Sequence, residues 1–374
     1  MSTLAPLRFR SARDSAFRHE LRTCVSNAVD LSGAGRHADW FILAKAVVLA
    51  ALAALAYAGA LLAQNPWHFA VAYTSCLLLA VLLAMNGLHD AAHGALFRSR
   101  RANRLTMRFI SVLIGIDTDF WTIRHVHFHH TYPNVDGYDL DIEPNPFLRQ
   151  TPFHAWAPQY RYQHLYWPLV AALSLPYLNW YGDWADRLGK TPVAFHSAWQ
   201  GWRGWLVFLA AKAAHVAVVL AIPVWALHDN AISWALVAAC YIGGQMVASC
   251  VLVALILGTH WAEVEFFKPT EAVLGHDWYE HSFRTACDWS PRPAALSHLM
   301  GGLNYHLTHH LFPTWSHRHY RQLAAIVADA SSRHGLCYRK LTYTQLIASQ
   351  QGFLKAMGRM PIPDEGRHAP KRKP

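Results

Sequence analysis

Long apolar runs alternate with polar, charged segments along this chain. Four of the runs are long enough to cross a bilayer, which takes about 20 apolar residues, and they cover residues 40–63, 69–88, 205–227 and 231–258. Only a few residues around Asn65 and Pro66 separate the first two runs, and a short turn around Asp229 and Asn230 separates the last two. The pattern predicts an all-α membrane protein with four transmembrane helices arranged as two hairpins.

The basic residues are distributed unevenly between the two sides of the predicted membrane. The two hairpin tips carry no Lys or Arg, whereas the segment 94–204 carries eleven, and both ends of the chain are also basic. Because Lys and Arg concentrate in cytosolic loops, we expect both termini and the central segment to be cytosolic.

Composition supports a membrane protein and argues against other classes. The chain is 53% hydrophobic and 15% charged, against about 25% charge in ordinary soluble domains. The net charge of +10 fits an anionic lipid surface better than nucleic acid, and no nucleic-acid partner is expected. The six cysteines form no CxxC pair, so neither a disulfide framework nor a cysteine-based zinc site is expected. No signal peptide is expected, because the first 39 residues are polar and rich in Arg.

Several shorter features complete the predicted organisation. Two apolar pieces, residues 107–116 and 164–178, are too short or too interrupted to span, and we expect them to lie in the interface plane. Lys212 and Gln245 fall inside predicted spans, where polar side chains are costly unless they face protein or reach the headgroups.

Three clusters of histidine lie just outside the apolar runs. They are HDAAH with His89 and His93, HVHFHH with His125, His129 and His130, and HLTHH with His306, His309 and His310. His260 follows the fourth run by two residues. With four crossings, the end of the second run, the central segment and everything after the fourth run share one side of the membrane. The histidine positions and the topology therefore agree.

The spacing within the clusters indicates a metal site. Residues four apart share one face of a helix, and this relates His89 to His93, His125 to His129, and His306 to His310. A neutral imidazole is the most common metal ligand in proteins. Eight or nine donors suit two ions better than one. Iron fits an all-nitrogen site with open positions for dioxygen, while zinc and copper remain open on spacing alone.

These histidine motifs resemble a known family. HDAAHG, HVHFHHTYPNVDGYDLDIEP and GGLNYHLTHHLFPTWSHRHY are similar, in order and spacing, to the three histidine boxes of the integral-membrane fatty acid desaturases. The segment RFRSARDSAF near the start is also like bacterial members of that family. The family's front-end members carry Gln at the first place of the third box, where this chain has His306. That difference argues against front-end regiochemistry.

The resemblance implies a di-iron site and assigns its residues. Its ligands would be the nine histidines His89, His93, His125, His129, His130, His260, His306, His309 and His310, with no catalytic residue beyond them. Outer acceptors that hold the ligand rings would come from Asp90, Asp139, Asp141, Glu263 and Asn304. The fold class implied is a four-helix membrane protein of two hairpins, with a cytosolic helical cap that carries the two irons.

The implied reaction is O₂-dependent desaturation of an acyl chain. The substrate would be an acyl-lipid, an acyl-CoA or an acyl chain on another carrier. No HPGG-type haem motif is present, so the electrons would come from a separate ferredoxin, rubredoxin or cytochrome b5. A hydroxylase, ketolase or acetylenase of the same family is the main alternative. A histidine-lined metal transporter and a membrane-anchored binding protein are more remote.

The expected domains follow from these assignments. Residues 1–39 would form a cytosolic N-terminal segment with an amphipathic helix, and residues 40–357 the membrane and catalytic domain. Residues 358–374, GRMPIPDEGRHAPKRKP, are rich in Pro and basic residues and predict a disordered tail. Because imidazole must be neutral to bind metal, metal loss is expected below about pH 6.5.

Overall fold

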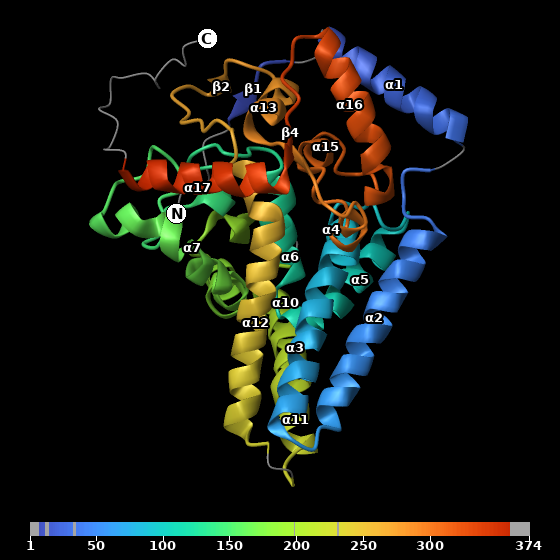
Figure 1. Ribbon diagram of the computed structural model, residues 1–374, viewed down its shortest axis with the longest axis vertical. Coiled ribbons are helices and arrows are strands. Elements are labelled where there is room, and N and C mark those ends of the chain that lie inside the picture. Colours follow the sequence, from blue (N-terminus) through green and yellow to red (C-terminus); the bar gives the residue numbers. More distant parts are fainter. Residues whose placement is uncertain (1–6, 12–14, 33–34, 198, 230–231, 360–374) are drawn as a thin grey trace.

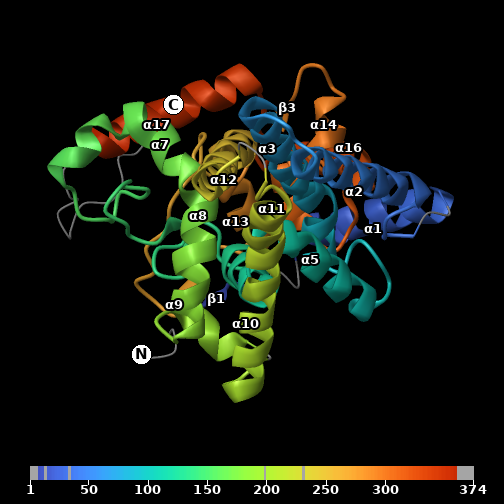
Figure 2. The same cartoon turned by 90° about the horizontal axis from the view of Figure 1, so that it is seen from below.

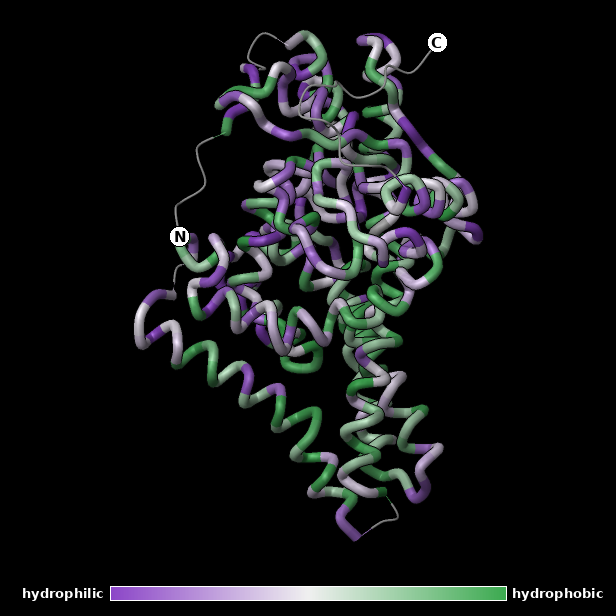
Figure 3. Tube along the Cα trace, turned by 90° about the vertical axis from the view of Figure 1, so that its left-hand side faces the viewer, coloured by the Kyte–Doolittle hydropathy of each residue, from purple (hydrophilic) through white to green (hydrophobic). Residues whose placement is uncertain are grey.

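A computed structural model describes residues 7–11, 15–32, 35–197, 199–229 and 232–359 of the chain. It shows an all-α architecture in which long helices form a stem and shorter helices form a cap over one end of it (Figure 1). Hydrophobic residues dominate the stem, while the cap mixes hydrophilic and hydrophobic segments (Figure 3). The predicted fold class is therefore confirmed.

Four helical spans in the described residues are long and apolar enough to cross a membrane, and each agrees with a predicted run to within four residues at either end. The first is α2 (Trp40–Leu61), and the second runs through α3 (Pro66–Leu83), η1 (Ala84–Leu88) and α4 (His89–Ala92). The third runs through α10 (Gly201–Val216), η7 (Ala217–Ala221) and α11 (Ile222–Ala226). The fourth consists of α12 (Trp234–Ile256) and η8 (Leu257–His260).

Local signals explain where the first hairpin begins and turns. The Asp39 side chain accepts a hydrogen bond from the Ile42 amide and caps α2, and Asn65 caps α3 in the same way with Pro66 at the first helical position. Exposed tryptophans lie at both ends of this hairpin, with Trp40 at the cap end and Trp67 at the tip. This is the distribution expected of side chains that anchor at the two membrane interfaces.

The central segment folds into short helices under the cap. They are α5 (Arg100–Ile114), α6 (Thr118–Thr122), η2 (Ile123–His129), η3 (Leu140–Ile142), η4 (Pro158–Tyr162), α7 (Gln163–Ala172), α8 (Ser174–Tyr177), η5 (Leu178–Gly182), α9 (Asp183–Arg187) and η6 (Pro192–His196). Lys212 of α10 donates hydrogen bonds of 2.7 Å to the Gly115 carbonyl, to Asn179 and to the Asp183 carboxylate. Gln245 donates to the Ile114 carbonyl. Both polar residues of the predicted spans therefore face protein.

The cap is built mainly from the region after the fourth span. It contains β2 (Val273–Leu274), α13 (Trp278–Thr285), β3 (Asp288–Ser290), α14 (Leu296–Leu299), α15 (His306–Leu311), η9 (His317–His319), α16 (Tyr320–Arg333), β4 (Lys340–Thr342) and α17 (Tyr343–Arg359). Helix α17 extends two residues into the range predicted as a disordered tail, and residues 360–374 lie outside the described part.

The N-terminal segment joins this cap. Strand β1 (Arg8–Phe9) pairs in parallel with β2, as β3 does with β4. The predicted amphipathic helix is α1 (Ala16–Ser32), which buries Phe17 and Leu21 in a cluster shared with α16. Glu20 forms an ion pair with Arg333 at 2.5 Å. The cap thus closes over the stem at the end where the histidine clusters lie.

Candidate metal centre

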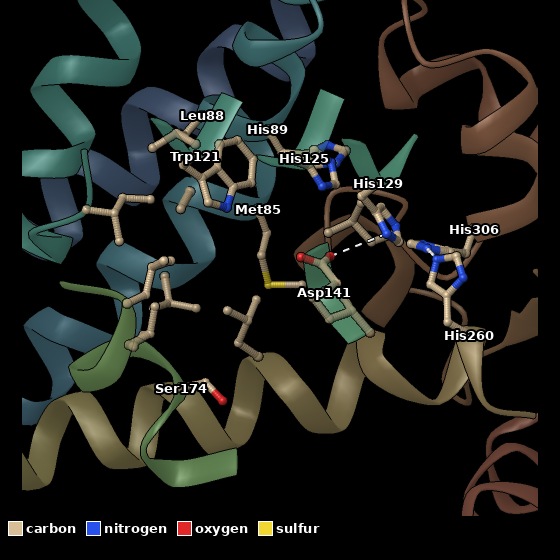
Figure 4. A pocket seen from close by; sticks show the side chains of 18 of the residues that line it. Met85, Leu88, His89, Trp121, His125, His129, Asp141, Ser174, His260 and His306 are labelled. Atoms are coloured by element: carbon tan, nitrogen blue, oxygen red, sulfur yellow. Dashed lines mark hydrogen bonds and ion pairs between the residues drawn. The ribbon is translucent and has the colours of Figure 1, made fainter. Parts of the chain in front are cut away.

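All nine histidines singled out in the sequence come together where the stem meets the cap. His89 begins α4, and His93 follows that helix directly. His125 and His129 lie on η2, His130 follows it, and the third cluster lies on α15. His260 ends the fourth span. Figure 4 shows five of these side chains, His89, His125, His129, His260 and His306, along one side of a cavity.

The nine rings divide into two groups that could each hold a metal ion. The first histidine group consists of His89, His93, His125, His130 and His309. The second histidine group consists of His129, His260, His306 and His310. Within each group, the potential ligand atoms lie within 4.8 Å of one another. The two groups adjoin, since the rings of His130 and His310 stack with their centroids 4.3 Å apart.

The separations between nitrogens fit metal coordination. Two nitrogens held about 2.1 Å from one ion at a right angle would lie about 3.0 Å apart. In the first group, the His125 Nε2 atom lies 3.1 Å from His89 Nε2 and 3.2 Å from His130 Nε2. In the second, the His310 Nε2 atom lies 3.1 Å from His260 Nε2 and 3.3 Å from His306 Nε2. Both groups therefore have the chemistry and the spacing of imidazole metal sites.

A π-helical turn decides how the second cluster is divided. The four-residue spacing predicted that His125 and His129 share one point, and these two histidines do lie together with Asp141 in a third group of possible ligands that overlaps the other two. Residues 123–129 form a π-helix, in which the His130 amide donates to the His125 carbonyl at 2.9 Å. Because a π-turn closes over five residues, His125 converges with His130 as well. His125 thus lies near His129, as the spacing predicted, and also belongs with His130 to the first histidine group, whereas His129 belongs to the second.

The third cluster divides along its α-helix. His306 and His310, four residues apart, both join the second histidine group, as the helical spacing predicted. His309 turns to the first group, where its Nε2 atom lies 2.9 Å from His130 Nε2. Helix α15 thus supplies histidines to both groups and couples their positions.

Burial keeps most of these rings neutral. Removal from water, reinforced by the neighbouring rings, holds the pKa well below the usual 6.5 for His93, His125, His130, His306, His309 and His310. A neutral ring has a free lone pair at physiological pH, so burial prepares these side chains for metal binding.

His129 differs because two carboxylates contact it. Its Nδ1 atom lies 3.1 Å from Asp139 and 3.4 Å from Asp141. Burial disfavours the charged ring, but the two carboxylates outweigh burial and raise the pKa of His129 to about 9. Asp139 is itself held by the backbone amides of Asn134 and Asp141. These two acids contact a predicted ligand as the sequence analysis expected.

Two outer contacts were not predicted. The His260 Nδ1 atom lies 3.0 Å from the Thr285 carbonyl, and the His309 Nδ1 atom lies 2.7 Å from the hydroxyl of the buried Tyr320. Such partners fix the tautomer and orientation of a metal-binding ring. A backbone carbonyl has no signature in sequence. Tyr320 closes the HRHY segment of the third motif, and that segment is the one signal that pointed to it.

The other three predicted acceptors, Asp90, Glu263 and Asn304, lie in other surroundings. Asp90 accepts hydrogen bonds from the ring and the backbone amide of His317. Glu263 is exposed, and Asn304 pairs with Ser297 and the Trp289 carbonyl. Asp90 therefore fixes the loop after α15 to the first box, whereas Glu263 and Asn304 are not brought to a histidine.

An apolar cavity of about 240 Å³ leads to the histidines. Its walls include Met85, Leu88, Ile114, Trp121 and Leu252, and His89, His125, His129, His260 and His306 line it as well (Figure 4). Trp121 stacks on His125 with ring centroids 4.8 Å apart. The site therefore combines grouped metal-binding side chains with a dry, hydrocarbon-like space.

The fold and this site define an integral-membrane protein with histidines arranged to hold metal. The sequence model of the fatty acid desaturase family matches residues 65–342. The chain belongs to that family, whose members catalyse an oxidative, metal-dependent reaction, and it is an oxidoreductase.

Curated relatives agree with this assignment. The chain is 28% identical to the sn-1 linoleoyl-lipid 6-desaturase of Synechocystis sp., over 79% of this chain and 82% of that protein. It is also 28% identical to the sn-1 linoleoyl-lipid 6-desaturase of Arthrospira platensis, over 74% of each chain. The acyl-lipid (8-3)-desaturase of Physcomitrium patens is 27% identical over 72% of this chain and 56% of that protein.

Proposed function

We propose that this fatty acid desaturase binds two iron ions, one in each histidine group, and uses O₂ to introduce a double bond into the acyl chain of a membrane lipid. The observation that carries the proposal is the pair of adjoining histidine groups beside an apolar cavity. The nine histidines would be the ligands. Four or five imidazoles in each group leave room for dioxygen, and iron suits such nitrogen-rich sites with open positions.

Iron would supply the oxidising chemistry, and the side chains would supply position and dryness. In the overall reaction, a CH₂–CH₂ unit, O₂, two electrons and two protons give CH=CH and two waters. The apolar walls bind the acyl chain and exclude water. Asp139 accepts a hydrogen bond from His129 Nδ1, and the Asp141 carboxylate lies 3.4 Å from the same nitrogen, so both acids direct the other ring nitrogen toward the second group. Tyr320 and the Thr285 carbonyl orient His309 and His260 in the same way.

The substrate, partner and location belong to the same proposal. The names of the relatives specify acyl-lipid or linoleoyl-lipid substrates, which supports a lipid-linked acyl chain here. A separate electron donor of the ferredoxin, rubredoxin or cytochrome b5 type would reduce the site. The basic central segment supports a cytosolic cap and cytosolic termini, in a bacterial inner membrane, with residues 40–357 as the catalytic domain.

We infer the position of the new double bond from the names of the relatives. Their names include 6-desaturases and an (8-3)-desaturase, although this chain carries His306 at the place that argued against front-end activity. His306 joins the second histidine group, so this residue acts at the metal and leaves bond position to the cavity walls. We therefore propose desaturation at a position like those of the relatives.

Expression in a host with simple lipids tests the proposal. We expect bound iron in the purified protein and new fatty acids that are lighter by two hydrogens. His306→Ala and His309→Ala should each abolish the product and lower the iron content. His127→Ala is the matched control, because His127 is exposed, stacks on His196 and belongs to neither group.

Other outcomes would point to the alternatives. Products heavier by one oxygen would indicate a hydroxylase. Metal flux in proteoliposomes without O₂ consumption would indicate a transporter. Purified protein without iron and without a new fatty acid would contradict the proposal.

A further inference from the structure

Two of the side chains that line the apolar cavity are exposed, Ser174 and Asp141, and most of the others are buried. Asp141 lies beside His129, next to the histidines. Ser174 begins α8, away from the histidines and against a membrane span. Ser174 therefore marks a place where the cavity meets the surface of the stem.

The mouth lies between α8 and the fourth span. The Leu175 amide donates to the Ser249 hydroxyl at 3.0 Å, and that hydroxyl donates to the Ala171 carbonyl at 2.7 Å. These bonds hold the junction of α7 and α8 against α12. Helices α8 and α12 lie side by side in Figure 2. Leu252, about one turn beyond Ser249, also lines the cavity. One wall of the mouth thus belongs to a membrane span.

The surface around the mouth is apolar. Five exposed side chains recur at every fourth residue along α7, α8 and η5, and we call them the apolar stripe: Leu165, Leu169, Leu173, Tyr177 and Tyr181. Their exposed fractions range from 45% to 69%. A run of large apolar side chains along one outer helix face is expected of a surface that contacts lipid. Ser174 lies directly beside Leu173 of this stripe.

Lining residues on the cap side include Asn134, Trp261 and Leu303, and each of these three is buried. Asp141, beside His129, is the exposed lining residue near the histidines, and its carboxylate makes that surface polar. The exposed surface at Ser174 differs because it adjoins the apolar stripe, which suits the entry of a hydrocarbon chain.

We propose that the cavity opens laterally into the bilayer between α8 and α12, and that it takes the acyl chain of a glycerolipid directly from the surrounding leaflet. This inference rests on the proposed function and specifies where the acyl chain enters the protein. Ser174 and Leu252 form the two sides of the mouth. The glycerol and headgroup remain at the interface while one acyl chain enters toward the histidines.

Photocrosslinking tests the route without relying on turnover. The full-length protein in nanodiscs of radiolabelled phosphatidylcholine would carry p-benzoylphenylalanine at position 174, at Leu105 as an exposed apolar control on α5, or at Ser332 as an exposed control on α16 of the cap. We expect label at positions 174 and 105 and at least about tenfold less at position 332. A position 174 that labels no more than position 332 would overturn the proposal.

Blocking the mouth tests its use in turnover. Ser174→Trp, and independently Leu252→Trp from α12, should lower desaturation of phosphatidylcholine-linked chains at least about tenfold with the iron content unchanged. Ser332→Trp is the matched control and should keep the wild-type rate. Iron content identifies any variant that fails to fold.

The outcomes separate the route from the chemistry. Wild-type protein that acts on phosphatidylcholine while both mouth variants keep its rate would overturn the lateral route and leave the desaturase function intact. Action on acyl-CoA but not on phosphatidylcholine would also overturn it. If the wild-type protein makes no double bond at all, the proposed function fails, and the crosslinking result then decides whether the opening faces lipid.

Discussion

At the scale of single residues, the outer contacts of the histidine rings differ from one ring to another. His129 contacts two carboxylates, His309 a tyrosine hydroxyl and His260 a backbone carbonyl. A carboxylate partner raises the basicity of a metal-binding ring more than a neutral partner does. The second histidine group therefore has the stronger anionic support, through Asp139 and Asp141.

Asp139→Asn should weaken metal binding at the second group. The substitution removes the buried charge that faces His129 Nδ1 while keeping nearly the same shape, and loss of such a partner costs roughly 10- to 100-fold in metal affinity. Competition with a chelator, followed by iron analysis, measures the effect. Asp136→Asn is the control, because Asp136 contacts His154 and neither histidine group. Equal iron retention by both variants would show that Asp139 does not support the site.

At the scale of elements, helix geometry positions both the histidines and one wall of the cavity. The π-turn of η2 sends His125 and His130 to one group and His129 to the other. The C-terminal end of α5 places Ile114 in the wall of the main cavity and also in that of a second, much smaller cavity deeper in the stem. Ile114 therefore separates the two spaces, together with Val81 and Leu175.

Ile114→Ala should lengthen the cavity and shift the preference toward longer acyl chains. Removing three carbons from this wall joins the two spaces, and the variant should accept chains longer by roughly one or two methylenes. Gas chromatography of the products measures the shift. Ile110→Ala, one turn earlier on α5, is buried but lines neither space.

This control matches the stability cost, because each substitution empties a buried isoleucine site at about 2–5 kcal/mol. A length preference that does not move with Ile114→Ala, or that moves equally with Ile110→Ala, would contradict this role for Ile114.

At the scale of the whole molecule, the cap and the stem depend on each other through the histidines. Rings from the second span, the central segment, the end of the fourth span and α15 meet at their junction. Closure of the cap buries these rings and lowers the pKa of most of them, with His129 as an exception. Folding of the metal-free protein is consequently linked to pH.

The metal-free protein should lose stability as pH falls below about 6.5. In the folded state the pKa of six rings lies well below 6.5. Below pH 6.5 the unfolded chain therefore binds more protons than the folded one, and the free energy of unfolding decreases as the pH is lowered. His129 has the opposite effect on the pH dependence of stability. Its pKa of about 9 gives stability that is complete below 6.5 and is lost as pH rises from 6.5 toward 9.

Thermal unfolding of chelator-treated protein in detergent measures this dependence. We expect a maximum near neutral pH, with a steeper decline on the acid side because six rings act there and one acts on the alkaline side. Iron should raise the unfolding temperature most at and above neutral pH, since binding requires neutral rings. An unfolding temperature that rises from pH 6.5 to about pH 5 would contradict the burial of neutral histidines.

The sequence by itself determined the membrane architecture and the identity of the histidines that meet. Runs of about 20 apolar residues can be satisfied only as spanning helices, so the four spans and their hairpins were predictable to within a few residues. The even number of membrane crossings then predicted that His89, His260 and His306 lie on one side of the membrane. Asp139 and Asp141 were also identified, because they closely follow the second histidine motif.

Only the tertiary structure decided how those side chains are divided and what supports them. The grouping of His125 with His130 depends on a local π-turn, which no periodicity in the apolar pattern encodes. The contacts of His309 with Tyr320 and of His260 with the Thr285 carbonyl depend on how the cap closes. The lateral mouth at Ser174 depends on the docking of α8 against α12. Local pattern fixes which segments enter the membrane, whereas packing between distant segments fixes which nitrogen faces which group.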